Sequence, residues 1–348
     1  MQLGIHSGRF LVLAAFLAGA CQPTAKQLPI RQEAAAGAPV WPEPPHRPRI
    51  RLVRAVARPQ DLGFRPSFWQ RVGELLGGKK EDWFVRPTGV AVHGFLIYVA
   101  DPGAQALWVL DVGAGRRRAL HRADGHPLVS PVAVAIGRNG RVYLADSYLG
   151  RVFVYDGEGE LTGRIGNPPV SRPAGVAYDA ERDHLYVADS GAHRVWIFDS
   201  GGTLTGAIGQ RGTGPGEFNF PTHVTVDSKG NIYVTDALNF RLQMFHADGS
   251  FAGQFGRHGD FSGDFASPKG VAVDSEGHIY VVDALFDAVQ IFDRQGRLLL
   301  TFGGRGIGAG QFWLPGGLCI DSRDRIYVAD SYNQRIQIFQ YLADGDDE

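Results

Sequence analysis

One phrase returns six times along this chain: a strand-like run with a tyrosine near its start and an aspartate at its end. Tyr98-Val-Ala-Asp101 and Tyr327-Val-Ala-Asp330 are the first and last copies, and the aspartates recur every 43 to 47 residues. A period of about 40 to 50 residues with strand-forming content is typical of a β-propeller, in which each repeat forms one blade. The chain is therefore predicted to be all-β, with six blades. The repeated aspartates are Asp101, Asp146, Asp189, Asp236, Asp283 and Asp330.

Each repeat holds four strand-forming runs in the same order, but the last repeat lacks its fourth. After Phe339 the chain has only a short segment and an acidic tail over 343–348. The run Ile50–Val56 precedes the first repeat and has no partner of its own. We expect this strand to complete the last blade, which closes the ring and removes an exposed sheet edge. The propeller should span 84–342, after a closing strand and a short capping helix within 49–83.

The first 20 residues have the pattern of a secretory signal peptide. Their apolar run of 11 residues ends at Ala20 and is too short to span a bilayer. Leu17-Ala-Gly-Ala-Cys21 resembles a bacterial lipobox, so Cys21 is the expected lipidation site; an ordinary cleaved signal is the alternative. The Pro- and Ala-rich stretch 21–48 would form an extended tether. We expect an exported protein, lipid-anchored to the bacterial membrane, with Gln22 favouring the outer membrane.

The repeats resemble NHL repeats. The resemblance is carried by Pro221–Phe245 and Pro315–Phe339, and by the glycine-rich connectors Gly209–Phe218 and Gly303–Phe312. It covers about residues 84–340 and implies a six-bladed propeller of four-stranded blades. It implies no single function, because the family includes scaffolds, RNA-binding proteins and an amidating lyase.

The repeated aspartates allow two interpretations. A cation site needs several carboxylates around one ion, but equivalent positions in six blades should lie on a circle too wide to share an ion. An aspartate at the end of a strand commonly accepts hydrogen bonds from backbone N–H groups of the following turn. We therefore predict a structural role for all six. Arg241 and Arg335 should pair with the aspartate of their own blade or of a neighbour.

The starts of the inner strands should line the central channel. Most residues expected there are glycine or alanine, and the polar or reactive exceptions are Thr222, His223 and Lys269. The resemblance to the amidating lyase implies that an enzyme of this family would use several channel histidines as zinc ligands. One histidine does not make a zinc site, so we predict no cofactor. A channel metal ion serving a lyase or hydrolase near His223 is the alternative.

The loops after the aspartates form a rim that carries aromatic and aliphatic side chains, which suit protein recognition. The formal net charge is −1 and the sole basic cluster is Arg116-Arg-Arg118, so nucleic-acid binding is not expected. We predict a non-catalytic interaction module or scaffold that presents this rim to a protein partner in the cell envelope. The predicted rim residues are Tyr148, Leu238, Phe240, Leu285, Phe286 and Tyr332.

Overall fold

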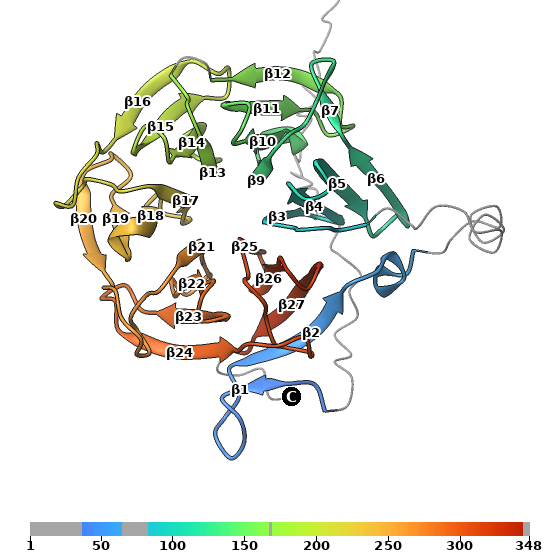
Figure 1. Ribbon diagram of the computed structural model, residues 1–348, viewed down its shortest axis with the longest axis vertical. Coiled ribbons are helices and arrows are strands. Elements are labelled where there is room, and N and C mark those ends of the chain that lie inside the picture. The colour runs from blue at the N-terminus through green and yellow to red at the C-terminus, as the bar shows by residue number, and fades with distance from the viewer. Residues whose placement is uncertain (1–36, 65–82, 167–168, 344–348) are drawn as a thin grey trace, which may run out of the picture.

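The computed structural model describes residues 37–64, 83–166 and 169–343. They form six antiparallel sheets arranged as blades around a central channel (Figure 1). In each of blades 1 to 5, four strands follow one another from the channel outward in chain order. The predicted all-β, six-bladed propeller is confirmed.

The first three blades differ little in strand length. Blade 1 contains β3 (Gly89–His93), β4 (Leu96–Asp101), β5 (Ala106–Asp111) and β6 (Arg116–Leu120). Blade 2 contains β9 (Pro131–Ile136), β10 (Val142–Asp146), β11 (Arg151–Tyr155) and β12 (Leu161–Ile165). Blade 3 contains β13 (Pro173–Asp179), β14 (His184–Asp189), β15 (Arg194–Asp199) and β16 (Leu204–Ile208).

The inner strand of the last blade is shorter than the others. Blade 4 contains β17 (Pro221–Val226), β18 (Ile232–Asp236), β19 (Arg241–Phe245) and β20 (Phe251–Phe255). Blade 5 contains β21 (Pro268–Val273), β22 (Ile279–Asp283), β23 (Ala288–Phe292) and β24 (Leu298–Gly303). Blade 6 contains β25 (Leu318–Ile320), β26 (Arg325–Asp330) and β27 (Arg335–Tyr341). The small remaining elements are the hairpin strands β7 (Arg122–Ala123) and β8 (His126–Pro127), and the 3₁₀ turns η1 (Pro59–Leu62), η2 (Arg138–Gly140) and η3 (Ala237–Asn239).

Blade 6 is completed by β2 (Ile50–Val56), as predicted. This strand runs antiparallel to β27, with Ile50 opposite Tyr341 and Val56 opposite Ile336, and the two lie side by side in Figure 1. A further strand, β1 (Val40–Trp41), pairs with β2 and makes this sheet five-stranded. Strand β1 lies inside the stretch 21–48 expected to be a tether, so the folded domain reaches further toward the N-terminus than its prolines suggested.

The core consists of six apolar clusters, each lying between two neighbouring blades. Side chains alternate between the two faces of a strand, so the second strand of each blade contributes side chains to the clusters on both sides of that blade. In blade 5, Tyr280 packs with Ile326 of blade 6, whereas Ile279 packs with Tyr233 of blade 4. The last cluster joins Tyr327 of blade 6 to blade 1 and closes the ring. The repeated Ile-Tyr-Val pattern therefore supplies contacts on both sides of every blade.

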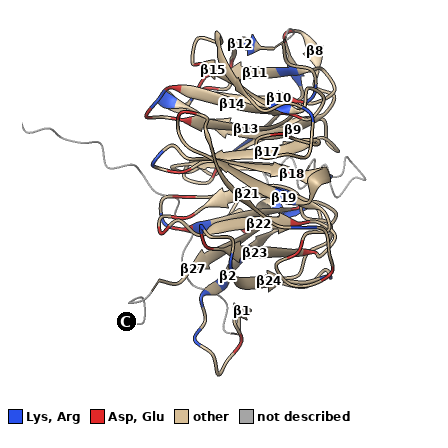
Figure 2. Ribbon diagram, turned by 90° about the vertical axis from the view of Figure 1, so that its left-hand side faces the viewer, with Lys and Arg blue, Asp and Glu red and all other residues tan. Residues whose placement is uncertain are grey.

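Some predicted features lie outside the described residues: the signal peptide 1–20, Cys21, the short capping helix expected within 49–83, after Ser67, and the end of the acidic tail. Within the described ranges, no helix has the length and apolar character needed to cross a membrane. A side view shows charged residues mainly in the turns at the two faces of the disc (Figure 2).

Candidate functional site

The six repeated aspartates end the second strands and are fully buried. Each accepts hydrogen bonds from two segments of its own blade. Asp101 accepts backbone N–H groups of Ala104, in the following turn, and of Val85 and Arg86, just before the inner strand, at 2.7 to 2.9 Å. The carboxylates thus hold together the loops of one face, called here the aspartate face.

Two arginines extend this network between blades. The Nε of Arg241 donates to Asp236 at 2.8 Å, and its terminal nitrogens donate to carbonyls of the preceding connector, including that of Gly214. Arg335 makes the same contacts with Asp330 and the connector before blade 6. Both guanidinium groups are buried, and they tie each blade to the connector that arrives from the previous one.

On the aspartate face the channel opens into a cavity of about 560 Å³, called here the mouth cavity. The channel residues and half of the rim residues predicted from the sequence line this one cavity, so the two sets form a single site. The predicted residues that line it are Thr222, His223, Lys269, Leu238, Leu285 and Tyr332.

The other rim residues lie elsewhere. Tyr148 is the most exposed of the predicted rim residues, with 76% of its surface accessible, but it does not line the mouth cavity. Phe240 is partly buried and packs edge-on against His258, with ring centroids 4.4 Å apart. Phe286 is also partly buried, and its backbone N–H donates to Asp283. These two phenylalanines therefore support the loops rather than present a free surface.

Below the mouth cavity the inner strands approach each other closely. The N–H of Gly317 donates to the carbonyl of Thr88 at 2.6 Å, and a Cβ on Gly317 would lie 2.6 Å from that oxygen. A Cβ on Gly89 or Gly270 would meet the next blade's backbone at 2.8 or 2.7 Å. The equivalent position in blade 4 is occupied by His223 instead of a glycine. His223 lines both the mouth cavity and a second cavity of about 290 Å³ on the far side.

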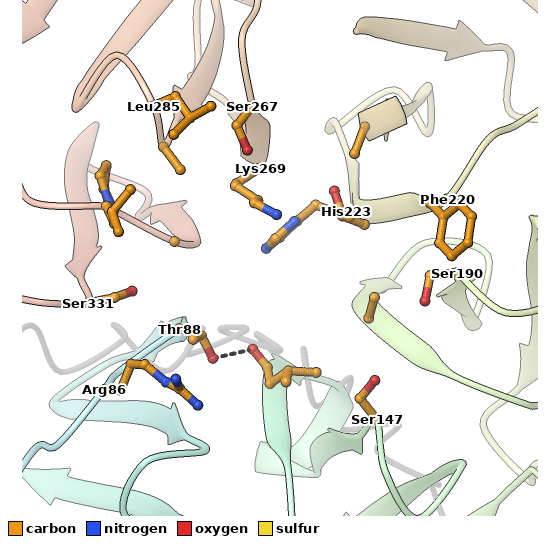
Figure 3. A pocket seen from close by; sticks show the side chains of 18 of the residues that line it. Arg86, Thr88, Ser147, Ser190, Phe220, His223, Ser267, Lys269, Leu285 and Ser331 are labelled. Carbon is orange, nitrogen blue, oxygen red and sulfur yellow. Dashed lines mark hydrogen bonds between the residues drawn. The ribbon is translucent and has the colours of Figure 1, made fainter. Parts of the chain in front are cut away.

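The side chains of His223 and Lys269 point toward the centre of the mouth cavity (Figure 3). Burial, and secondarily the positive charge of Lys269, lower the pKa of His223 to about 3, so the imidazole is neutral at physiological pH. Burial also lowers the pKa of Lys269, opposed by the nearby carboxylate of Asp283. The Nδ1 of His223 and the Oγ1 of Thr222 are buried without a hydrogen-bond partner among the described residues.

Two arginines that the sequence did not single out also line the mouth cavity, Arg86 and Arg172. Each stands immediately before the proline that opens an inner strand, in blades 1 and 3. A Cβ on Gly103 would lie 2.8 Å from the Cβ of Arg86, and one on Gly191 would lie 3.1 Å from that of Arg172. A signal was present in the sequence, because these are the two repeats in which glycine stands two residues after the aspartate.

The donor groups at the mouth cavity decide whether it could hold a metal ion. Among the described residues, no group of three or more His, Cys, Asp or Glu side chains is placed to hold one. Of the described side chains that line the mouth cavity, His223 is the sole imidazole, and the charged group that acts on it is the cation Lys269. This donor set does not fit the three protein ligands of a catalytic zinc site.

Large apolar side chains that are exposed gather on the aspartate face. Three of those in the described residues, Leu204, Phe251 and Leu299, lie instead on the outer strands β16, β20 and β24. The others occupy the loops and connectors of the aspartate face: Val85, Tyr148, Leu238, Phe261, Leu285, Ile307, Trp313 and Tyr332.

The chain resembles several solved structures at low sequence identity. A structural-genomics protein of unknown function from Bacteroides thetaiotaomicron is 19% identical, with a TM-score of 0.60 over 76% of this chain and 71% of that one. An auxiliary nutrient binding protein from the same species is 14% identical, with a TM-score of 0.59 over 75% and 70%. Virginiamycin B lyase from Staphylococcus aureus is 13% identical, with a TM-score of 0.55 over 74% and 96%. These likenesses concern the fold.

Family models match two parts of the chain. A six-bladed β-propeller model matches residues 179–255, and the NHL repeat model matches residues 265–287 and 312–339. Among proteins of curated function, no sequence matches this chain significantly. The matched repeats lie in blades 5 and 6 of the observed ring. The chain is a six-bladed β-propeller that contains NHL repeats.

Proposed function

We propose that this propeller is a non-catalytic interaction module of the bacterial cell envelope, which docks a partner protein on its aspartate face. The observation that carries the proposal is the collection of exposed apolar side chains on the loops of this one face. Exposed apolar residues scattered singly need no explanation, but their concentration on one face is typical of an interaction site. The aspartate network holds these loops on a rigid scaffold, which suits recognition.

The charges around the mouth cavity restrict the chemistry of the partner. The described residues that line it include Arg86, Arg172 and Lys269 and no carboxylate. The docked segment should therefore carry acidic groups together with apolar side chains, because complementary charge favours association. A lyase or hydrolase centred on His223 has less support, because the residues around this histidine do not fit a metal site.

The location in the envelope is part of the same proposal. Its support is the lipobox-like string that ends at Cys21. Attachment of the lipoprotein acyl chains would give stable membrane anchoring. Metabolic labelling with a palmitate analogue in a bacterial host should label the full chain and leave Cys21→Ala unlabelled. Equal labelling of both chains, or of neither, would argue against the anchor.

The docking role can be tested by photo-crosslinking in intact cells that naturally make the protein. A photoreactive amino acid is placed singly at Leu285, Tyr332 or Tyr148 on the aspartate face. All three side chains are exposed, at 63%, 49% and 76%. We expect the three positions to give an adduct with the same protein, which mass spectrometry then identifies.

The matched controls are Leu299 and Leu204, which are exposed at 50% and 45% on outer strands. Neither control position should give that adduct. If the outer strands crosslink to the same protein as efficiently as the aspartate face, or if the face gives no adduct, the docking proposal is wrong.

A further inference from the structure

Three cationic side chains from three blades line the mouth cavity. Arg86 comes from blade 1, Arg172 from blade 3 and Lys269 from blade 5. Figure 3 shows Arg86 reaching in from the side opposite Lys269. Positive groups placed together in a concave site concentrate the electrostatic field and attract anions.

The guanidinium groups of the two arginines are not engaged by other described residues. Within the described part of the chain, neither guanidinium group of Arg86 or Arg172 forms a hydrogen bond or ion pair. Asp101 and Asp189 form no ion pair with these guanidinium groups and instead accept the backbone N–H groups of the same arginines, each at 2.9 Å. The network therefore fixes the main chain at each arginine and leaves the side chain free to bind.

Apolar side chains also line the mouth cavity. Blades 4, 5 and 6 contribute Leu238, Leu285, Leu314 and the ring of Phe220. A ligand that fills this cavity can place an anionic group toward the arginines of blades 1 and 3 and an apolar group against these side chains, while Lys269 adds a cation on the blade 5 side. An acidic side chain or a chain end next to an apolar residue has this arrangement.

We propose that the mouth cavity is a carboxylate-binding site, in which Arg86, Arg172 and Lys269 bind an acidic group of the docked partner protein. Guanidinium groups bind carboxylates through charge-assisted hydrogen bonds, often two at once. Thr222 and His223 line the same cavity. This inference rests on the docking role proposed above for the source of the carboxylate, but the binding site itself can be tested without the partner.

The test is a titration of the purified protein with glutarate, followed by the NMR signals of the arginine Nε–H groups. We expect saturable shifts of the Arg86 and Arg172 signals, with a dissociation constant on the order of 1 mM. Glutaramide, which has the same length and no charge, should cause no saturable shift. Inorganic phosphate should bind more weakly than glutarate, because it cannot use the apolar wall.

Variants distinguish binding at the mouth cavity from non-specific attraction of anions to the protein surface. Arg86→Gln with Arg172→Gln should weaken glutarate binding about tenfold or more. Both side chains are exposed and unpaired, so the variant should fold, which circular dichroism checks. The matched control is Arg305→Gln, because Arg305 is exposed on a connector of the same face and does not line the cavity.

Three outcomes would overturn the carboxylate site: no saturation with glutarate, equal shifts with glutaramide, or an equal loss of affinity in Arg305→Gln. Tighter binding of phosphate than of glutarate would also overturn it, in favour of an inorganic-anion site. If the titration shows no binding, the carboxylate site is wrong, and the photo-crosslinking experiment still decides whether a partner protein docks on the aspartate face. If glutarate binds but the face gives no adduct, the carboxylate site stands and the partner protein is excluded as the source of the carboxylate.

Discussion

At the scale of single residues, His223 occupies a position that the other repeats keep small. The equivalent residues are Gly89, Ala133, Gly175, Gly270 and Gly317. Close contact between inner strands explains the glycines, since a Cβ there would meet backbone atoms at less than 3 Å. Blade 4 alone among these positions carries a side chain long enough to reach across the channel, and that side chain separates the two cavities.

The buried imidazole predicts a pH dependence of stability. The pKa of His223 is lowered to about 3 from an ordinary value near 6.5. Between these values the unfolded chain binds the proton and the native protein does not, so the free energy of unfolding falls as pH falls. From pH 6.5 to 5 this histidine should account for a loss of roughly 2 kcal/mol. Urea unfolding of the wild type and of His223→Gln should show the smaller pH dependence in the variant; parallel curves would contradict the expectation.

His278 provides a control of opposite sign. Its Nδ1 lies 2.9 Å from Asp274, and this hydrogen bond raises the pKa of His278 above 6.5. Its stabilising contribution is present below pH 6.5 and is lost as pH rises through the folded-state pKa. His278→Gln should therefore be less stable than the wild type mainly below pH 6.5, and the difference should shrink as pH rises above that value; His223→Gln should instead gain stability relative to the wild type as pH falls.

At the scale of elements, β2 closes the ring without a covalent link to β27. Its Leu52 is 5% exposed and belongs to the cluster between blades 5 and 6. The short strand β1 adds Trp41, whose ring packs against Phe302 and Phe339 with centroids 5.8 Å away. Two strands from the start of the folded region thus cover the outer edge of the last blade.

Leu52→Asp should weaken this closure strongly. A carboxylate in an apolar cluster loses its hydration, and the lost packing adds to the cost, so we expect a loss of at least about 4 kcal/mol. Release of β2 would also expose the edge of β27 and favour association. Urea unfolding and light scattering measure the two effects. Leu204→Asp, on the exposed side of outer strand β16, should change stability by less than about 0.5 kcal/mol; equal effects of the two variants would refute the closing role of β2.

The two N-terminal strands differ in how well they could be predicted. Ile50–Val56 is seven residues of strand-forming sequence, and the missing strand of the last repeat indicated its place. Strand β1 has two residues in a proline-rich stretch, and such a segment shows no periodicity. Its strand conformation depends on the aromatic contacts of Trp41, which only the assembled blade provides.

At the scale of the whole molecule, the repeat determines the architecture and the differences between repeats determine the site. The fold was predictable because every blade uses the same alternation around its tyrosine. The mouth cavity was predictable in part: Thr222, His223 and Lys269 were found from their strand positions. Arg86 and Arg172 were missed because their presence in the cavity depends on a glycine in a separate loop of each blade. The six-fold scaffold therefore carries one cavity lined by cations from blades 1, 3 and 5 and by apolar side chains from blades 4, 5 and 6.

The pairing of β2 with β27 has a consequence for how the ring could be rewired. Because Ile50 lies opposite Tyr341, the first and last strands of the ring are neighbours in a single sheet. A short linker across that sheet edge could join them, and new ends could be opened in any connector between blades. Such circular permutants would keep the same closed ring and the same mouth cavity, while moving the break in the chain to a junction between blades of the experimenter's choice.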